Sequence, residues 1–132
     1  MRRLIVLLLV LLVIATACSG SDEPDAFVEI ITPQHASEVW EDGGDDLVVL
    51  DIRTAEEFDQ ARIAGAVNID YYGADFRRRL GELDPEARYL VYCRTGNRSE
   101  AAVPIMEGLG FTRIYQINGG IAAWYEAGFP IE

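Results

Sequence analysis

Residues 89–99 read YLVYCRTGNRS, which is the most informative segment for predicting the fold. Its first four residues form a continuous apolar run, which is typical of a strand buried on both faces of a parallel sheet. Arg98 and Ser99 then open a segment whose pattern predicts a helix over residues 98–109. A buried strand that leads through a short loop into a helix is the repeating unit of an α/β protein.

The same alternation extends in both directions from this stretch. The run LVVL at residues 47–50 predicts a second buried strand. Thr54 and Glu57 have the spacing of a capping box at the start of a helix, and Gly108 and Gly110 are typical of a helix end. Further strands are predicted at 27–31, 66–69 and 113–117, and further helices at 34–40, 54–61, 72–80 and 121–127. We expect one α/β domain over residues 27–132.

The first 17 residues have the pattern of an export signal. Arg2-Arg3 precedes an apolar run over residues 4–15. That run is shorter than the roughly 20 apolar residues that a membrane-spanning helix needs. Residues 1–17 are therefore predicted to be a signal peptide, with an uncleaved anchor helix as the alternative.

Residues 15–18 read ATAC, which resembles the lipobox of bacterial lipoproteins. In that family the cysteine is lipidated and becomes the mature N-terminus, so the resemblance implies a lipid anchor on Cys18. Ala15 stands where the family prefers Leu, and ordinary signal cleavage at the same bond is an alternative. Residues 18–26 form a polar tether that suits a flexible linker. We expect the protein to be exported and held at the outer face of the cytoplasmic membrane or in the periplasm.

The chain is acidic, which limits its possible partners. It has 22 Asp and Glu residues against 11 Arg, no Lys, and a net charge of −11 at pH 7. Such a balance disfavours binding to nucleic acid and to anionic membrane surfaces. Any site for an anionic ligand must therefore be local.

Cys93 lies where a local anion site is expected. Its thiol follows a buried strand and precedes a helix N-terminus, where unpaired backbone amides and the helix dipole lower the pKa of a thiol. Gly96 and Asn97 allow backbone conformations that other residues avoid. The guanidinium groups of Arg94 and Arg98 present forked donors that suit oxyanions.

The loop CRTGNRS at residues 93–99 resembles the active-site loop of the rhodanese family. Three more motifs stand in that family's order: LDIRTAEEF at 50–58, IAGAVNI at 63–69 and GGIAAW at 119–124. The resemblance covers nearly all of residues 27–132. It implies a three-layer α/β/α fold with a central, mostly parallel five-stranded sheet.

The resemblance also implies sulfurtransferase activity. Cys93 would take sulfane sulfur from a donor such as thiosulfate, hold it as a persulfide, and pass it to a thiol or a cyanide-type acceptor. No metal or organic cofactor is implied, and we expect a monomer. Cys93 and Arg98 are the predicted catalytic residues, and the predicted substrate-binding residues are Arg94, Thr95, Gly96, Asn97 and Ser99.

Other functions stay open at this point. Ala61-Arg62 and Ala64 replace the Gly, His and Pro that the family usually carries, which affects the expected substrate preference. A non-catalytic module that carries sulfur or docks onto a partner would have the same loop. Cysteine phosphatases and arsenate reductases resemble this loop but have five residues between the cysteine and the arginine, whereas Cys93 and Arg98 have four between them.

Several polar residues are expected to have structural roles. Asp51 and Arg53 end a buried strand, so Arg53 is predicted to pair with Glu57 or with the region of Asp51. His35 is the only histidine and is predicted to lie on the surface, which excludes a Cys/His dyad. Residues 77–79 are three adjacent arginines and are predicted to be largely solvated.

Overall fold

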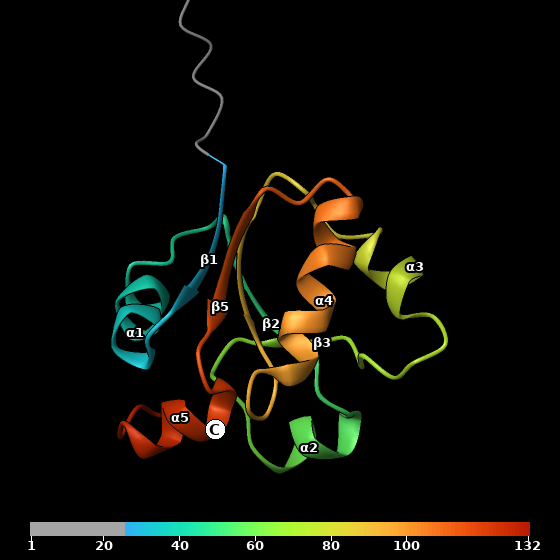
Figure 1. Cartoon of the computed structure of the whole chain (residues 1–132). Helices are drawn as coiled ribbons and strands as arrows, with labels where there is room; N and C mark the ends of the chain where they lie inside the picture. The colour runs from blue at the N-terminus through green and yellow to red at the C-terminus, as the bar shows by residue number, and fades with distance from the viewer. Residues whose placement is uncertain (1–25) are drawn as a thin grey trace, which may run out of the picture.

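Strands and helices alternate along residues 26–132, the part of the chain that the computed structural model describes (Figure 1). The predicted signal peptide and Cys18 lie outside these residues. No helix within them is long and apolar enough to cross a membrane. The strands are β1 (Phe27–Ile31), β2 (Leu47–Asp51), β3 (Val67–Asn68), β4 (Arg88–Tyr92) and β5 (Arg113–Ile117), and the helices are α1 (Pro33–Glu41), α2 (Ala55–Gln60), α3 (Phe76–Leu80), α4 (Asn97–Gly108) and α5 (Gly120–Glu126).

The five strands form one sheet in the order β1-β5-β4-β2-β3, and every neighbouring pair is parallel. The predicted five-stranded α/β fold is therefore confirmed, and the sheet is wholly rather than mostly parallel. Strand β4 lies in the middle, where its last four residues are buried. This position explains its continuous apolar run, because helices cover both faces of the sheet.

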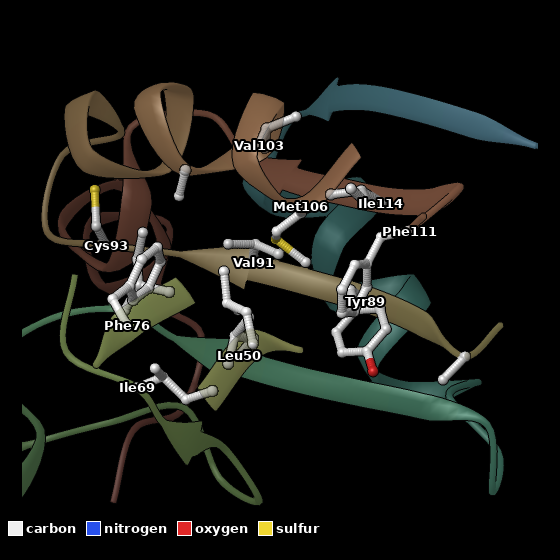
Figure 2. Close-up of a cluster of buried hydrophobic side chains, with 14 residues drawn as sticks. Leu50, Ile69, Phe76, Tyr89, Val91, Cys93, Val103, Met106, Phe111 and Ile114 are labelled. Carbon is white, nitrogen blue, oxygen red and sulfur yellow. The ribbon is translucent and has the colours of Figure 1, made fainter. Parts of the chain in front are cut away.

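Two hydrophobic clusters, one on each face of the sheet, form the core. Alternate residues of β4 point to opposite faces, so that Tyr89, Val91 and Cys93 join the cluster beneath α3 and α4, while Leu90 and Tyr92 join the cluster beneath α1 and α5. Figure 2 shows the first cluster, with Cys93 at the end of the row formed by Tyr89 and Val91. The thiol thereby lies at the end of the buried central strand.

The carboxyl ends of the parallel strands meet at one edge of the sheet, and α2 lies at this edge (Figure 1). Cys93 follows β4 there, Arg53 follows β2, and Gly119 follows β5. Ligands of open α/β sheets bind at this edge, outside the carboxyl ends of the strands. The fold therefore brings together residues that are distant in the sequence.

A buried ion pair closes the end of β2. The guanidinium of Arg53 bonds both carboxylate oxygens of Asp51, at 2.6 Å in the shortest contact, and the backbone amide of Arg53 donates to Asp51 Oδ1 at 2.8 Å. Both side chains are buried, and Arg53 Nη2 also donates to the Ala61 carbonyl at 2.6 Å. Arg53 was predicted to pair with Glu57 or with the region of Asp51, and in the structure it pairs with Asp51.

Two predicted elements are shorter than expected. The prediction of a helix from residue 72 is wrong for its first four residues, because Asp70 forms a turn in which its carboxylate accepts from Tyr72 N at 2.9 Å and its carbonyl from Gly73 N at 3.0 Å. Strand β3 has two residues where four were predicted. Strand β3 is at the edge of the sheet, where it pairs only with β2.

Candidate active site

The loop between β4 and α4 carries the predicted catalytic cysteine. Cys93 directly follows β4, and α4 begins at Asn97. Gly96 caps this helix with a φ of 107°, a left-handed conformation that side chains disfavour. The loop was predicted to use glycine for an unusual backbone conformation, and Gly96 adopts one. Its left-handed conformation turns the chain sharply into α4.

The sulfur of Cys93 faces hydrogen-bond donors from its own loop. Gly96 N donates to Cys93 Sγ at 3.1 Å, and Cys93 as a whole residue is 1% exposed. Burial by itself raises the pKa of this thiol, but hydrogen bonding from the Ser99 hydroxyl and from the amides of Ser99, Gly96 and Thr95 outweighs it. The net effect lowers the pKa of Cys93, as expected for a thiol that reacts as a thiolate.

The Ser99 hydroxyl is buried beside this thiol. No polar group among the described residues bonds Ser99 Oγ with ordinary hydrogen-bond geometry, although its proximity contributes to the lowered pKa of Cys93. We therefore regard the hydroxyl as a donor held near the sulfur rather than as a completed bond. A buried donor of this kind is satisfied when negative charge builds up on the sulfur.

Helix α5 sets the orientation of the loop. Ile121 N donates to the Cys93 carbonyl at 2.9 Å, and Ala122 N donates to the Arg94 carbonyl at 3.1 Å. Because the C=O and N–H of one peptide unit point in opposite directions, these bonds turn the next amides away from α5 and toward the sulfur. Gly120 permits the close approach, since a Cβ there would lie 2.6 Å from the Arg94 carbonyl oxygen. From the sequence alone, this glycine was noted only as part of the GGIAAW motif at residues 119–124.

Arg98 has a partner that sequence reasoning missed. Its guanidinium forms a two-point ion pair with Glu57, at 2.7 and 2.8 Å. Glu57 also accepts from the Thr54 amide at 3.0 Å, so the predicted capping box is present and its carboxylate serves two partners. The hydrogen bond to Glu57 is the main cause of the raised pKa of Arg98, and a negative charge on Cys93 adds to it. Arg98 is thus held with its positive charge near the thiol.

This ion pair makes stability sensitive to acid. The hydrogen bond from Arg98 lowers the pKa of Glu57 from 4.5 to about 2. A carboxylate with a lowered folded-state pKa contributes stability above its unfolded pKa, and that contribution is lost as the pH falls toward the folded value. We expect Glu57→Gln to have a lower free energy of unfolding than the wild type at about pH 7. As the pH falls from about 4.5 to 2, the free energy of unfolding of the variant should decrease less than that of the wild type.

Urea unfolding at a series of pH values measures this effect. Glu126→Gln is the matched control, because Glu126 is exposed and forms no ion pair within residues 26–132. This control should follow the wild-type curve. Parallel curves for Glu57→Gln and the wild type across the acid range would contradict the assigned role of the pair.

Three of the remaining loop residues lie at the surface. Arg94, Thr95 and Asn97 are exposed, whereas Ser99 is buried. A pocket of about 430 Å³ borders the loop at Arg94. The predicted substrate-binding residues Arg94, Thr95 and Asn97 are therefore exposed on the loop whose backbone amides donate to the buried sulfur.

Other residues considered from the sequence lie outside this loop. Arg62, which replaces the family's usual histidine, pairs with Glu132 at 3.0 Å and packs on the ring of Phe58. His35 is exposed, as predicted. Within residues 26–132, no group of three or more His, Cys, Asp or Glu side chains is placed to hold a metal ion.

Known proteins share both the sequence and the fold of this chain. A thiosulfate sulfurtransferase GlpE of Ectopseudomonas mendocina (strain ymp) is 35% identical over 103 residues, which make up 77% of this chain and 88% of that protein. A rhodanese-related protein from Thermoplasma volcanium superposes with a TM-score of 0.67 at 32% identity, over 80% of this chain and 98% of the other. The rhodanese-like domain of the Anabaena sp. Alr3790 protein superposes with a TM-score of 0.71 at 23% identity, over 80% of each chain, and shows the shared fold.

The family match spans most of the described domain. Residues 33–127 match the model of the rhodanese-like domain, a span that includes α1, the whole cysteine loop and α5. The parallel sheet and the loop between β4 and α4 agree with this match. The chain belongs to the rhodanese-like domain family.

Proposed function

We propose that this protein is a sulfurtransferase that uses Cys93 as its nucleophile and a thiosulfate-type anion as its sulfur donor. The observation that carries the proposal is the buried Cys93 sulfur, which accepts a hydrogen bond from Gly96 N inside a loop of inward-facing amides. The similarity to thiosulfate sulfurtransferases supports the choice of donor. No metal or organic cofactor takes part in the proposed reaction.

The first half of the reaction follows from the chemistry of the thiolate. Cys93 Sγ forms a bond to the outer sulfur of thiosulfate, the S–S bond of the donor breaks, and sulfite leaves with the electron pair. The product is a Cys93 persulfide, which is itself an anion. The loop amides and the Ser99 hydroxyl stabilise this charge without rearrangement, which is how preorganised donors accelerate a reaction.

Arg98 contributes through its charge near the sulfur, because Glu57 occupies its forked donors. We expect Arg98→Ala to lower kcat/KM for thiosulfate about 10²- to 10³-fold, the range expected when one preorganised group that stabilises developing negative charge is removed. Arg98→Lys should recover only part of this, since an ammonium group does not reproduce the two-point pairing.

Steady-state assays of thiosulfate with cyanide measure the effect of Arg98. Glu57→Gln is the comparison, because it breaks the same ion pair and leaves the positive charge in place. It should lose less activity than Arg98→Ala. Equal losses in both variants would mean that Arg98 acts only by holding Glu57.

Two alternative functions predict different results in the same assays. A sulfur-carrier or partner-docking module would form the persulfide without turning over thiosulfate and cyanide. A cysteine phosphatase or arsenate reductase would act on aryl phosphates or arsenate, although the four-residue spacing from Cys93 to Arg98 does not favour a tetrahedral oxyanion. Sulfur transfer with no aryl-phosphate turnover is the expected result, and the reverse pattern would overturn the proposal.

We also propose that the protein is exported as a monomer with a lipid anchor on Cys18. The motivation is the signal-like segment and the ATAC sequence at residues 15–18. Cys18→Ser should move the protein from the membrane fraction to the soluble fraction, because the modified thiol is lost. Fractionation followed by intact mass measures this, and a Cys18→Ser protein that stays membrane-bound to the same extent would favour an uncleaved anchor.

A further inference from the structure

The outer edge of strand β1 is unpaired within the part of the chain that the structure describes. β1 is the outermost strand of the sheet and pairs only with β5 (Figure 1). Phe27 N donates to the residue before β5 at 2.7 Å, and the Ile31 carbonyl accepts from the residue after β5 at 2.8 Å. Because successive residues of a strand direct their backbone groups to opposite sides, the N–H and C=O groups of Val28 and Ile30 point away from β5.

Val28 and Ile30 also present apolar side chains to the solvent. Val28 is 44% exposed and Ile30 is 63% exposed. Ile31 joins the core cluster beneath α1 and α5, so these two side chains point to the opposite face of the sheet, which carries α4. A hollow of about 330 Å³ lies on that face, and Val28 lines it together with Glu107 and Phe111. The edge therefore offers backbone hydrogen bonds, apolar surface and a hollow for a side chain.

Strand β1 lacks several features that usually keep other strands away from a sheet edge. Edge strands are commonly very short, or they carry proline, lysine or a bulge. The strand at the other edge, β3, has two residues, whereas β1 has five and contains no proline or lysine. The pairing of β1 with β5 is continuous over all five residues, so β1 has no bulge. Such an edge suits strand addition, in which an extended segment lengthens the sheet.

The charges around β1 determine which segment fits its edge. Glu29 is exposed and points to the α1 face of the sheet, and Glu107 lines the hollow on the α4 face. Neither carboxylate forms an ion pair within residues 26–132. A second copy of this chain fits poorly, because an antiparallel pair that matches Val28 with Ile30 places Glu29 opposite Glu29. A segment with a basic residue opposite Glu29 has the complementary charge.

We propose that the edge of β1 binds an extended segment of another protein as a sixth strand, and that this segment alternates apolar residues with arginine or lysine. Its backbone pairs with the outward N–H and C=O groups of Val28 and Ile30. Its apolar side chains lie beside those two residues, and its basic side chains lie on the other face beside Glu29. β5 separates this edge from β4, the strand that leads to Cys93, so the edge recruits a partner and takes no part in sulfur transfer.

The test titrates the full chain with an acetylated and amidated hexapeptide of alternating arginine and valine. NMR measures the dissociation constant and the amide hydrogen exchange of individual residues. A hexapeptide of alternating glutamate and valine has the same apolar residues and the opposite charge. The arginine peptide should bind saturably and slow the exchange of the Val28 and Ile30 amides, and the glutamate peptide should bind at least about tenfold more weakly.

Three variants give distinct expectations. Glu29→Arg should lower the affinity for the arginine peptide about tenfold and should raise the affinity for the glutamate peptide. Glu126→Arg makes the same change of charge at an exposed position of α5, so it should keep the wild-type preference. Ile30→Pro removes one outward N–H and leaves the bonds to β5 in place, so it should weaken binding of the arginine peptide about tenfold.

Several results would overturn this inference. No saturable binding of the arginine peptide would do so, as would binding that leaves the exchange of Val28 and Ile30 unchanged. Equal effects of Glu29→Arg and Glu126→Arg would mean that only the net charge attracts the peptide. Concentration-dependent dimerisation through β1 would replace the basic segment by a second copy. None of these measurements uses thiosulfate, so their outcome is independent of the proposed sulfurtransferase function.

Discussion

Replacing Cys93 by Ser is expected to abolish sulfur transfer from thiosulfate. A neutral hydroxyl neither ionises near neutral pH nor accepts sulfane sulfur, so the loss should be on the order of 10⁴-fold or more, as for other covalent nucleophiles. The loop should keep its shape, because its orientation comes from backbone bonds to Ile121 and Ala122. The measurement is steady-state turnover of thiosulfate and cyanide.

The fold of the Cys93→Ser protein must be checked alongside its activity. In urea unfolding, the free energy of unfolding should differ from that of the wild type by about 1–2 kcal/mol. The change is small because the buried hydroxyl can accept hydrogen bonds from the donors that surround the sulfur. A folded Cys93→Ser protein that turns over thiosulfate at a substantial rate would show that the sulfur passes through another group.

Among the variants proposed for this protein, removal of the Asp51 carboxylate is expected to lower the free energy of unfolding most. Asp51 is 0% exposed and Arg53 is 7% exposed, so Asp51→Ala leaves a buried guanidinium without its counter-charge. Breaking a buried pair in this way costs about 3–5 kcal/mol. Urea or thermal unfolding measures the cost directly.

The matched control for this prediction is Asp46→Ala. Asp46 also pairs with an arginine, Arg88, at 2.9 Å, but its side chain is half exposed. Exposed pairs contribute about 1 kcal/mol or less, because water and salt screen them. Equal losses at Asp51 and Asp46 would show that burial does not determine the strength of these pairs.

The strands of the sheet were predictable from local patterns in the sequence, whereas their order in the sheet was not predicted. The run at residues 89–92 has no polar face, and in the structure β4 is the central strand with helices on both sides. The edge strand β1 was also predicted, although much of it is exposed. The start of α3 was not, because an Asp70 turn satisfies backbone groups that a helix would otherwise bond.

The candidate site was only partly predictable. Cys93 and its loop have a local signature of strand end, glycine and helix start. No local signature marks the pairing of Arg98 with Glu57, since these residues are 41 positions apart. From the sequence, Glu57 was predicted to cap its own helix. The support of the loop by α5 likewise depends on the packing of distant elements, which no short pattern records.

In the proposed reaction, Cys93 is a thiol of lowered pKa that stores sulfur as a persulfide. The most direct measurement of this role is the intact mass of the purified protein after exposure to thiosulfate, combined with the rate of Cys93 alkylation against pH. We predict a gain of one sulfur atom that is absent in Cys93→Ser, and an alkylation midpoint below the roughly 8.5 of free cysteine. A Cys93 that titrates at or above that value and never gains sulfur would contradict the account.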